Sequence, residues 1–108
     1  MTETRAWLYV IIAGVFEMVW AIGLKYSQGF SRPLPSAVTA FAMLASMWLL
    51  AQALRVLPVG TGYAVWVGIG AVGTAMLGII LLGESRQPMR LLSIVLIVIG
   101  IAGLRLAK

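Results

Sequence analysis

Residues 6–24, AWLYVIIAGVFEMVWAIGL, form an apolar run that is interrupted by a single charged residue. A run of this length matches the roughly 17 to 25 residues that a helix needs to cross a lipid bilayer. Glu17 lies near the middle of the run, where an ionisable side chain costs about 2.5 to 3.5 kcal/mol on insertion scales. We therefore expect Glu17 to have a function that offsets this cost.

Three further apolar runs follow the first one along the chain. The sequence has 108 residues, of which 62% are hydrophobic and 10% charged, and a soluble domain of this size could not bury so much apolar surface. The connections between the runs are short, so successive helices should run antiparallel. We predict an all-α protein of the cell inner membrane, with one four-helix domain over residues 1–108 and both termini on one side. The expected spans are residues 6–24, 34–54, 59–82 and 89–104.

Several kinds of chemistry lack the residues that they require. Cysteine and histidine are both absent, which excludes disulfides, thiol nucleophiles and imidazole catalysis. The sequence also has no nucleophile paired with a base, no metal-binding cluster and no phosphate-binding loop. We therefore expect a protein that is not an enzyme and has no metal or cofactor. No nucleic-acid-binding motif accompanies the net charge of +5, so nucleic acid is not an expected partner.

Positive charges are divided equally between the two sides of the predicted bundle. The side with the termini carries Arg5, Arg55, Arg105 and Lys108, and the opposite side carries Lys25, Arg32, Arg86 and Arg90. Because the Lys/Arg imbalance between loops orients a membrane protein, a balanced chain should insert in both orientations. Oppositely inserted copies can pair as an antiparallel, dual-topology homodimer, which has the symmetry of the inverted repeats in larger transporters.

Glu17 is expected to bind both protons and a cation. No lysine or arginine lies in the interior of the predicted spans, so an ion pair within the membrane is not possible. The carboxyl should be protonated while no cation is bound, because hydrocarbon disfavours the charged form. Protons and a cation would then compete for one site, which is the chemical basis of exchange. A packing role, with protonated Glu17 bonded to a backbone carbonyl, is the alternative.

Two residues of the first span lie within one helical turn of Glu17 on its face. Gly14 would allow another helix to approach closely, and the indole of Trp20 would border the carboxyl. Trp20 is also near the end of the span, where it could instead belong to the aromatic belt at the membrane surface.

The second and third spans contribute further candidates for the site. Tyr63, Trp66 and Gly70 form one stripe, with two aromatic side chains and a bare stretch of backbone. Ser46, midway along the second span, could donate a hydrogen bond to a carboxylate. Tyr63 could instead be a belt residue, and Ser46 could bond to its own backbone.

Glycine pairs in the third and fourth spans suggest roles in movement and in packing. Gly68 and Gly70 belong to a glycine cluster that predicts a bend or hinge. Gly100 and Gly103 offer a close-packing face in the fourth span, which we interpret as a dimer contact; packing within one subunit is the alternative.

Together, these motifs resemble those of the small multidrug resistance transporters. The resemblance covers essentially the whole chain and includes EMVW, LKYSQGF, PVGTGYAVWVGIG and the four-span layout. The guanidinium-exporter subtype is the most similar, because Trp20 follows Glu17 by three residues and because AIGLKYSQGF and LLGESRQPMR are present. Gly62 and Val67 depart from that subtype, which commonly has alanine and threonine at these positions.

The resemblance implies an antiparallel homodimer in which two Glu17 carboxylates share one central site. It implies exchange of protons for guanidinium ion, or for small substituted guanidiniums, with two protons per cation. The site residues that it implies are Glu17, Trp20, Ser46, Tyr63 and Trp66, with Gly14 lining the pocket, a flexible region at Gly68 to Gly70, and dimer packing at Gly100 and Gly103.

The sequence leaves two other functions open. A multidrug efflux pump for aromatic or quaternary ammonium cations would share the fold and Glu17 but would need a looser pocket. A non-transporting membrane subunit would use Glu17 to serve a partner protein and would be active only with that partner. Guanidinium suits a pair of carboxylates because its fork of N–H donors matches their bidentate geometry.

Overall fold

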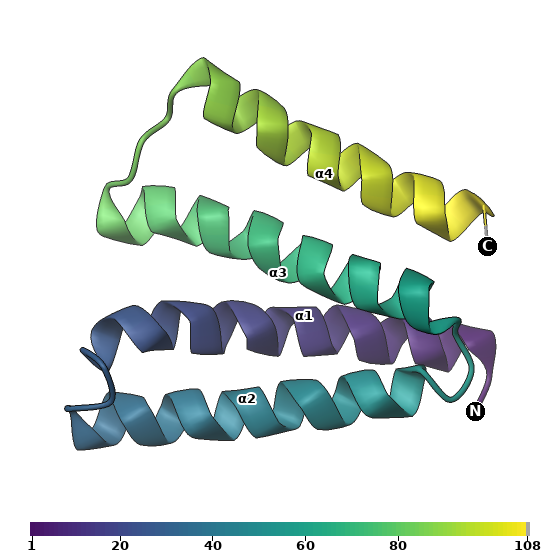
Figure 1. Cartoon of the computed structure of the whole chain (residues 1–108), viewed down its shortest axis with the longest axis horizontal. Helices are drawn as coiled ribbons and strands as arrows, with labels where there is room; N and C mark the ends of the chain where they lie inside the picture. Colours follow the sequence, from purple (N-terminus) through teal and green to yellow (C-terminus); the bar gives the residue numbers. More distant parts are fainter. Residues whose placement is uncertain (108) are drawn as a thin grey trace.

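The computed structural model describes residues 1–107, which form four long α-helices (Figure 1). The helices are α1 (Glu3–Tyr26), α2 (Pro33–Ala53), α3 (Val59–Leu82) and α4 (Pro88–Ala107). Each is long and apolar enough to cross a membrane, which confirms the prediction of an all-α chain with four such helices. The bounds of α3 are as expected, whereas α1 and α4 continue beyond the apolar runs at both ends.

Helix ends are set by residues with well-understood preferences. The side chain of Thr2 caps α1 by accepting a hydrogen bond from the backbone N–H of Arg5, at 3.2 Å. Pro33 and Pro88 are the first residues of α2 and α4, where proline has no backbone N–H to leave unpaired. Gly83 ends α3 with a positive φ of 66°, which a residue without a Cβ adopts at little cost.

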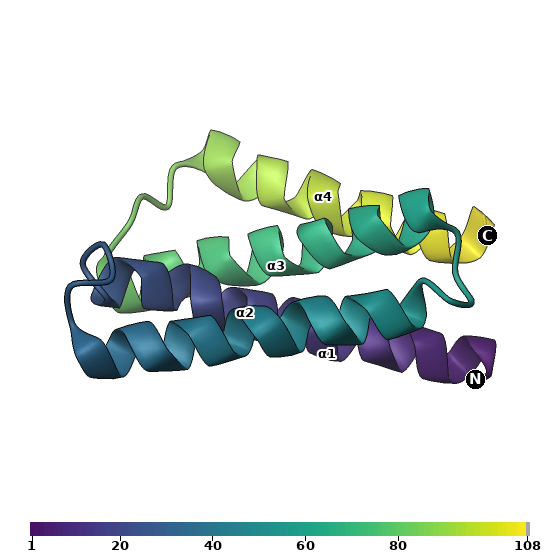
Figure 2. The same cartoon turned by 60° about the horizontal axis from the view of Figure 1, so that its bottom comes forward.

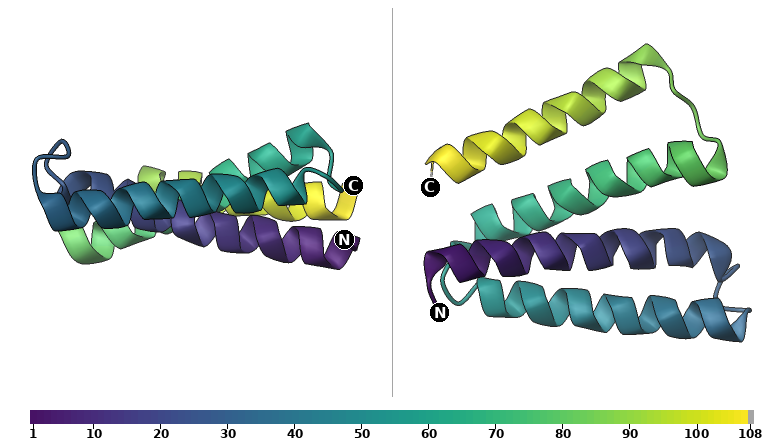
Figure 3. Two further views of the ribbon diagram at one scale, coloured as in Figure 1. Left: turned by 90° about the horizontal axis from the view of Figure 1, so that it is seen from below. Right: turned by 180° about the vertical axis from the view of Figure 1, so that it is seen from behind.

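The helices lie side by side in a thin layer in the order α4, α3, α1, α2 (Figure 1). The molecule measures 39 × 34 × 16 Å, so the bundle is flat, and α2 also touches α3 directly. The backbone of α4 approaches only that of α3. Both termini lie at one end and the α1–α2 and α3–α4 connections at the other, which Figures 2 and 3 show from further directions.

The buried core lies where α1 meets α2 and α3. Its members are Ala6, Val10, Ala13, Leu50, Ala53, Leu57, Val65 and Trp66. No described residue of α4 is buried, and a Cβ added at Gly100 or Gly103 would meet no atom within 4 Å. The two glycines are thus open to the surroundings rather than packed within the subunit, and a dimer contact at this position stays a prediction.

The glycines of α3 allow neighbouring side chains to approach its backbone. A Cβ at Gly68 would meet Ile101 and Ile97 of α4, and a Cβ at Gly73 would meet Met18 of α1. α3 is an unbroken helix through this segment, so the expected hinge at Gly68 and Gly70 stays a prediction.

Candidate functional site

The carboxyl group of Glu17 extends from the middle of α1 to the backbone of α3. A Cβ at Gly70 would collide with this carboxyl, so only glycine at that position allows the observed approach. Glu17 is partly buried, and its Oε1 atom is enclosed with no hydrogen-bond partner among residues 1–107. A buried oxygen without a partner is unusual in a folded protein and marks a place where a ligand can bind.

Trp20 presents a second unpaired polar atom on the same helix. Its Nε1–H is buried and has no acceptor within the described part of the chain. Because Trp20 follows Glu17 by three residues, both side chains lie on one face of α1. An acceptor and a donor without partners therefore occupy neighbouring positions in the middle of the bundle.

A chain of two hydrogen bonds joins three helices one turn before Glu17. The Ser46 hydroxyl donates to the backbone carbonyl of Ala13 at 2.6 Å, and Trp66 Nε1–H donates to the Ser46 oxygen at 2.9 Å. Ser46 is completely buried. Its hydroxyl thus bonds to α1 rather than to its own helix or to the Glu17 carboxyl, because helix packing brings Ser46 level with Ala13.

Aromatic rings extend this cluster toward the surface of the layer. The ring centres of Tyr63 and Trp66 are 5.6 Å apart, with the planes tilted by 51°. Trp66 is 9% exposed and Tyr63 is 55% exposed. The two rings therefore lie against each other and run from the buried core to the exposed surface of α3, while their role in a site stays a prediction.

Three other residues singled out from the sequence lie at helix contacts or at the surface. Gly14 is buried at the contact of α1 with α3, where a Cβ would collide with Ile69. Gly62 is buried against the side chain of Leu54, and Val67 is exposed.

Sequence reasoning did not identify Thr74 as a candidate. Its Oγ1 atom is buried in α3 and has no partner in residues 1–107. Thr74 lies one turn beyond Gly70, so it shares the side of α3 that meets Glu17. The sequence does show a hydroxyl four residues after Gly70 in an apolar helix. It does not show which face of α3 meets α1, so Thr74 could not be placed beside the site.

No group of three or more residues that could hold a metal ion occurs in the described part of the chain. The polar atoms that converge in the bundle are one carboxyl, two indole N–H groups and two hydroxyls. This set suits an organic cation with N–H groups better than a bare metal ion, which requires several oxygen or nitrogen ligands. Four membrane-spanning helices with a carboxyl among them are features of a small membrane transporter.

Comparison with known proteins identifies the family. The model of the small multidrug resistance proteins matches residues 5–97, and the chain belongs to this family. It is a multi-pass inner-membrane transporter and not an enzyme, as expected.

Curated relatives match almost the whole chain. A protein of Escherichia coli named "Guanidinium exporter" is 62% identical over 102 residues, which are 94% of this chain and 97% of the relative. A protein of Yersinia pseudotuberculosis with the same name is 63% identical over 103 residues, 95% of this chain and 99% of the relative. A third, from Salmonella typhimurium, is 60% identical over 102 residues, with 94% and 97% covered.

Replacing Ser46 by alanine should destabilise the protein by about 1 to 3 kcal/mol, because the buried Nε1–H of Trp66 would lose its acceptor. In a double-mutant cycle with Trp66→Phe, which removes the donor, the combined loss should be smaller than the sum of the single losses. Unfolding in detergent, followed by circular dichroism, measures these free energies. Strictly additive losses would show that the hydrogen bond does not hold α2 and α3 together.

Proposed function

We propose that the protein exports guanidinium ion in exchange for protons, and that Glu17 binds either the proton or the cation. The observation that carries this proposal is the enclosed Glu17 Oε1 atom, which has no partner among residues 1–107 and lies in a membrane-spanning helix. The names of the relatives, which are 60 to 63% identical over nearly their whole lengths, support guanidinium as the cation.

Guanidinium fits the chemistry of the groups around Glu17. It is planar and carries N–H donors along its edge, so a carboxylate can accept two hydrogen bonds from it. Its face is attracted to the π-systems of aromatic rings, which Tyr63 and Trp66 supply on α3. Ser46 would not contact the cation itself. Its hydrogen bonds to Ala13 and Trp66 hold α1, which carries Glu17, against the part of α3 that carries the aromatic rings.

Exchange follows from competition for the Glu17 carboxyl. A proton neutralises the carboxyl and removes its attraction for the cation, whereas bound guanidinium favours the ionised form. Proton uptake on one side of the membrane would therefore release guanidinium, and guanidinium binding on the other side would release protons. Transport of either species alone is disfavoured because an empty, ionised carboxylate in the membrane is costly.

The proposed working unit is an antiparallel homodimer with two Glu17 carboxyls at one central site. Three observations support it: the bundle is flat, with a shortest extent of 16 Å, no described residue of α4 is buried, and the lysines and arginines are balanced between the two sides. Two carboxyls would allow two protons to be exchanged for each cation. The dimer contact would include the open glycines of α4, Gly100 and Gly103.

Purified protein in liposomes should carry a proton-coupled current when guanidinium is added. Bulky quaternary ammonium ions, which have no N–H donors, should give little current. Glu17→Gln should abolish the current, because a neutral amide neither takes up and releases a proton in this pH range nor attracts a cation as a carboxylate does. The currents can be recorded from these liposomes after they are adsorbed to a solid-supported membrane electrode.

Glu3→Gln is the matched control, since it removes an acidic residue at the start of α1 and should leave the current unchanged. A persistent current in Glu17→Gln would contradict the scheme. Stronger currents with quaternary ammonium ions would indicate a multidrug pump, and no current with either cation would favour a subunit that needs another protein.

The balanced charges predict that copies enter the membrane in both orientations. The chain has no cysteine, so a single cysteine can report on each side: Gln87→Cys in the α3–α4 connection and Ala107→Cys at the end of α4. A membrane-impermeant thiol reagent added outside intact cells should label about half of the copies of each variant. Complete labelling of one variant and protection of the other would show a single orientation.

A further inference from the structure

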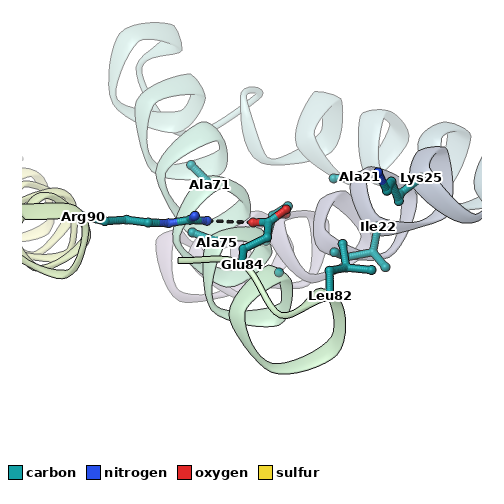
Figure 4. A pocket seen from close by; sticks show the side chains of 10 residues that line it. Ala21, Ile22, Lys25, Ala71, Ala75, Leu82, Glu84 and Arg90 are labelled. Carbon is teal, nitrogen blue, oxygen red and sulfur yellow. Dashed lines mark hydrogen bonds and ion pairs between the residues drawn. The ribbon is translucent and has the colours of Figure 1, made fainter. Parts of the chain in front are cut away.

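A pocket of about 340 Å³ lies between α1, α3 and the α3–α4 connection (Figure 4). It is at the end of the bundle opposite the termini, beside the α3–α4 connection. The residues of its lining that matter here are Ala21, Lys25, Thr74, Gly78, Glu84 and Arg90. Ala21 follows Glu17 by one helical turn, so the inner end of the pocket lies about one turn from the level of the proposed exchange site.

Polar groups occur at regular intervals along the side of α3 that faces this pocket. The Glu17 carboxyl contacts Gly70, and the Glu84 carboxyl contacts Gly78 in the same way, since a Cβ at either glycine would collide with it. Thr74 lies midway between the two glycines, and its hydroxyl is buried without a partner in the described chain. Successive levels are about 6 Å apart, because a helix rises about 1.5 Å per residue. Glu17, Thr74 and Glu84 thus form a series that leads from the middle of the bundle to its surface.

Arg90 occupies the outermost position of this series. Its Nη2–H donates to Glu84 Oε1 at 2.7 Å, and the two side chains are 32% and 45% exposed (Figure 4). The arginine side chain ends in a guanidinium group, which is the ion that we propose as substrate. Arg90 therefore binds Glu84 with the same N–H chemistry that a free guanidinium ion would use.

The charged residues of the pocket bear on whether a cation can take the place of Arg90 at Glu84. Lys25 also lines the pocket, so its described lining carries two cationic residues, Lys25 and Arg90, and one acidic residue, Glu84. Displacement of Arg90 leaves one positive and one negative residue. Ion pairs that are exposed to this extent are weak, so a competing cation can replace Arg90.

We propose that Glu84 is an outer cation-binding site on the path to Glu17, and that Arg90 occupies it until a guanidinium ion displaces the arginine side chain. This inference rests on the proposed function. The cation would bind first to Glu84, pass the Thr74 hydroxyl, which can accept one of its N–H bonds, and then reach Glu17. A quaternary ammonium ion has no N–H donors to replace those of Arg90, so the outer site would contribute to selectivity.

Two variants should change the guanidinium concentration that gives half-maximal current in opposite directions. Glu84→Gln should raise it by about two-fold or more, because the outer site is lost, and Arg90→Gln should lower it by a similar factor, because the internal competitor is lost. Arg86→Gln is the matched control: it removes the same charge four residues earlier, in the α3–α4 connection and outside the pocket lining, and it should have no effect.

Binding to Glu84 can be tested separately from transport. In protein that carries Glu17→Gln and Arg90→Gln, titration with guanidinium chloride should shift the amide resonances of Thr74, Gly78 and Glu84. Adding Glu84→Gln should remove these shifts. The spectrum before titration shows whether each variant is folded. If the variant with Glu84→Gln is not folded, Glu84→Asp replaces it, because aspartate keeps the charge but has a shorter side chain.

The outcomes separate the two proposals. A wild-type guanidinium current that Glu84→Gln and Arg90→Gln leave unchanged would overturn the outer site and keep the proposed function. An absence of guanidinium current in the wild type would overturn the proposed function, and the titration would still decide the outer site. Absence of shifts at Thr74, Gly78 and Glu84 in folded protein overturns the outer site in either case.

Discussion

The structure depends on one constraint, a carboxyl group in the middle of a membrane-spanning helix that has no basic residue at its depth. A permanent ion pair would have removed both the cost of Glu17 and its capacity to exchange ligands. Instead, the contact with Gly70 brings the carboxyl to the backbone of α3, and Oε1 is enclosed with no partner among residues 1–107. We propose that a bound proton or cation offsets the cost of this ionisable group in hydrocarbon.

The rest of the bundle positions this group and leaves it accessible. One turn before Glu17, Ser46 of α2 donates a hydrogen bond to Ala13 of α1 and accepts one from Trp66 of α3, which links the three helices. The helices form a single thin layer, so the aromatic stripe that ends in Tyr63 remains open on one face. One subunit thus provides half of an enclosure, and we propose that a second, inverted copy provides the other half.

Hydropathy was sufficient to predict the four helices. The single charge within an apolar run made Glu17 the main candidate for the site, and its role stays a prediction. Hydropathy and residue spacing did not show which helix faces meet. Spacing could not show that Gly14 packs against Ile69 or that the Ser46 hydroxyl donates to the Ala13 carbonyl, and the site roles of both residues stay predictions. The contacts of Glu17 with Gly70 and of Glu84 with Gly78 depend on how α1, α3 and their connections pack. Helices that are apolar on almost every side give little indication of which face packs against a neighbouring helix.

The most direct test of competition at Glu17 is the affinity of the purified protein for guanidinium, measured by calorimetry over a range of pH. The account predicts that binding weakens as the pH falls, by up to about ten-fold per pH unit for each competing proton, because protonation removes the carboxylate that binds the cation. Glu17→Gln should lose this dependence together with the tight binding. An affinity that is the same at every pH, or is unchanged in Glu17→Gln, would contradict the claim that protons and guanidinium compete for this carboxyl.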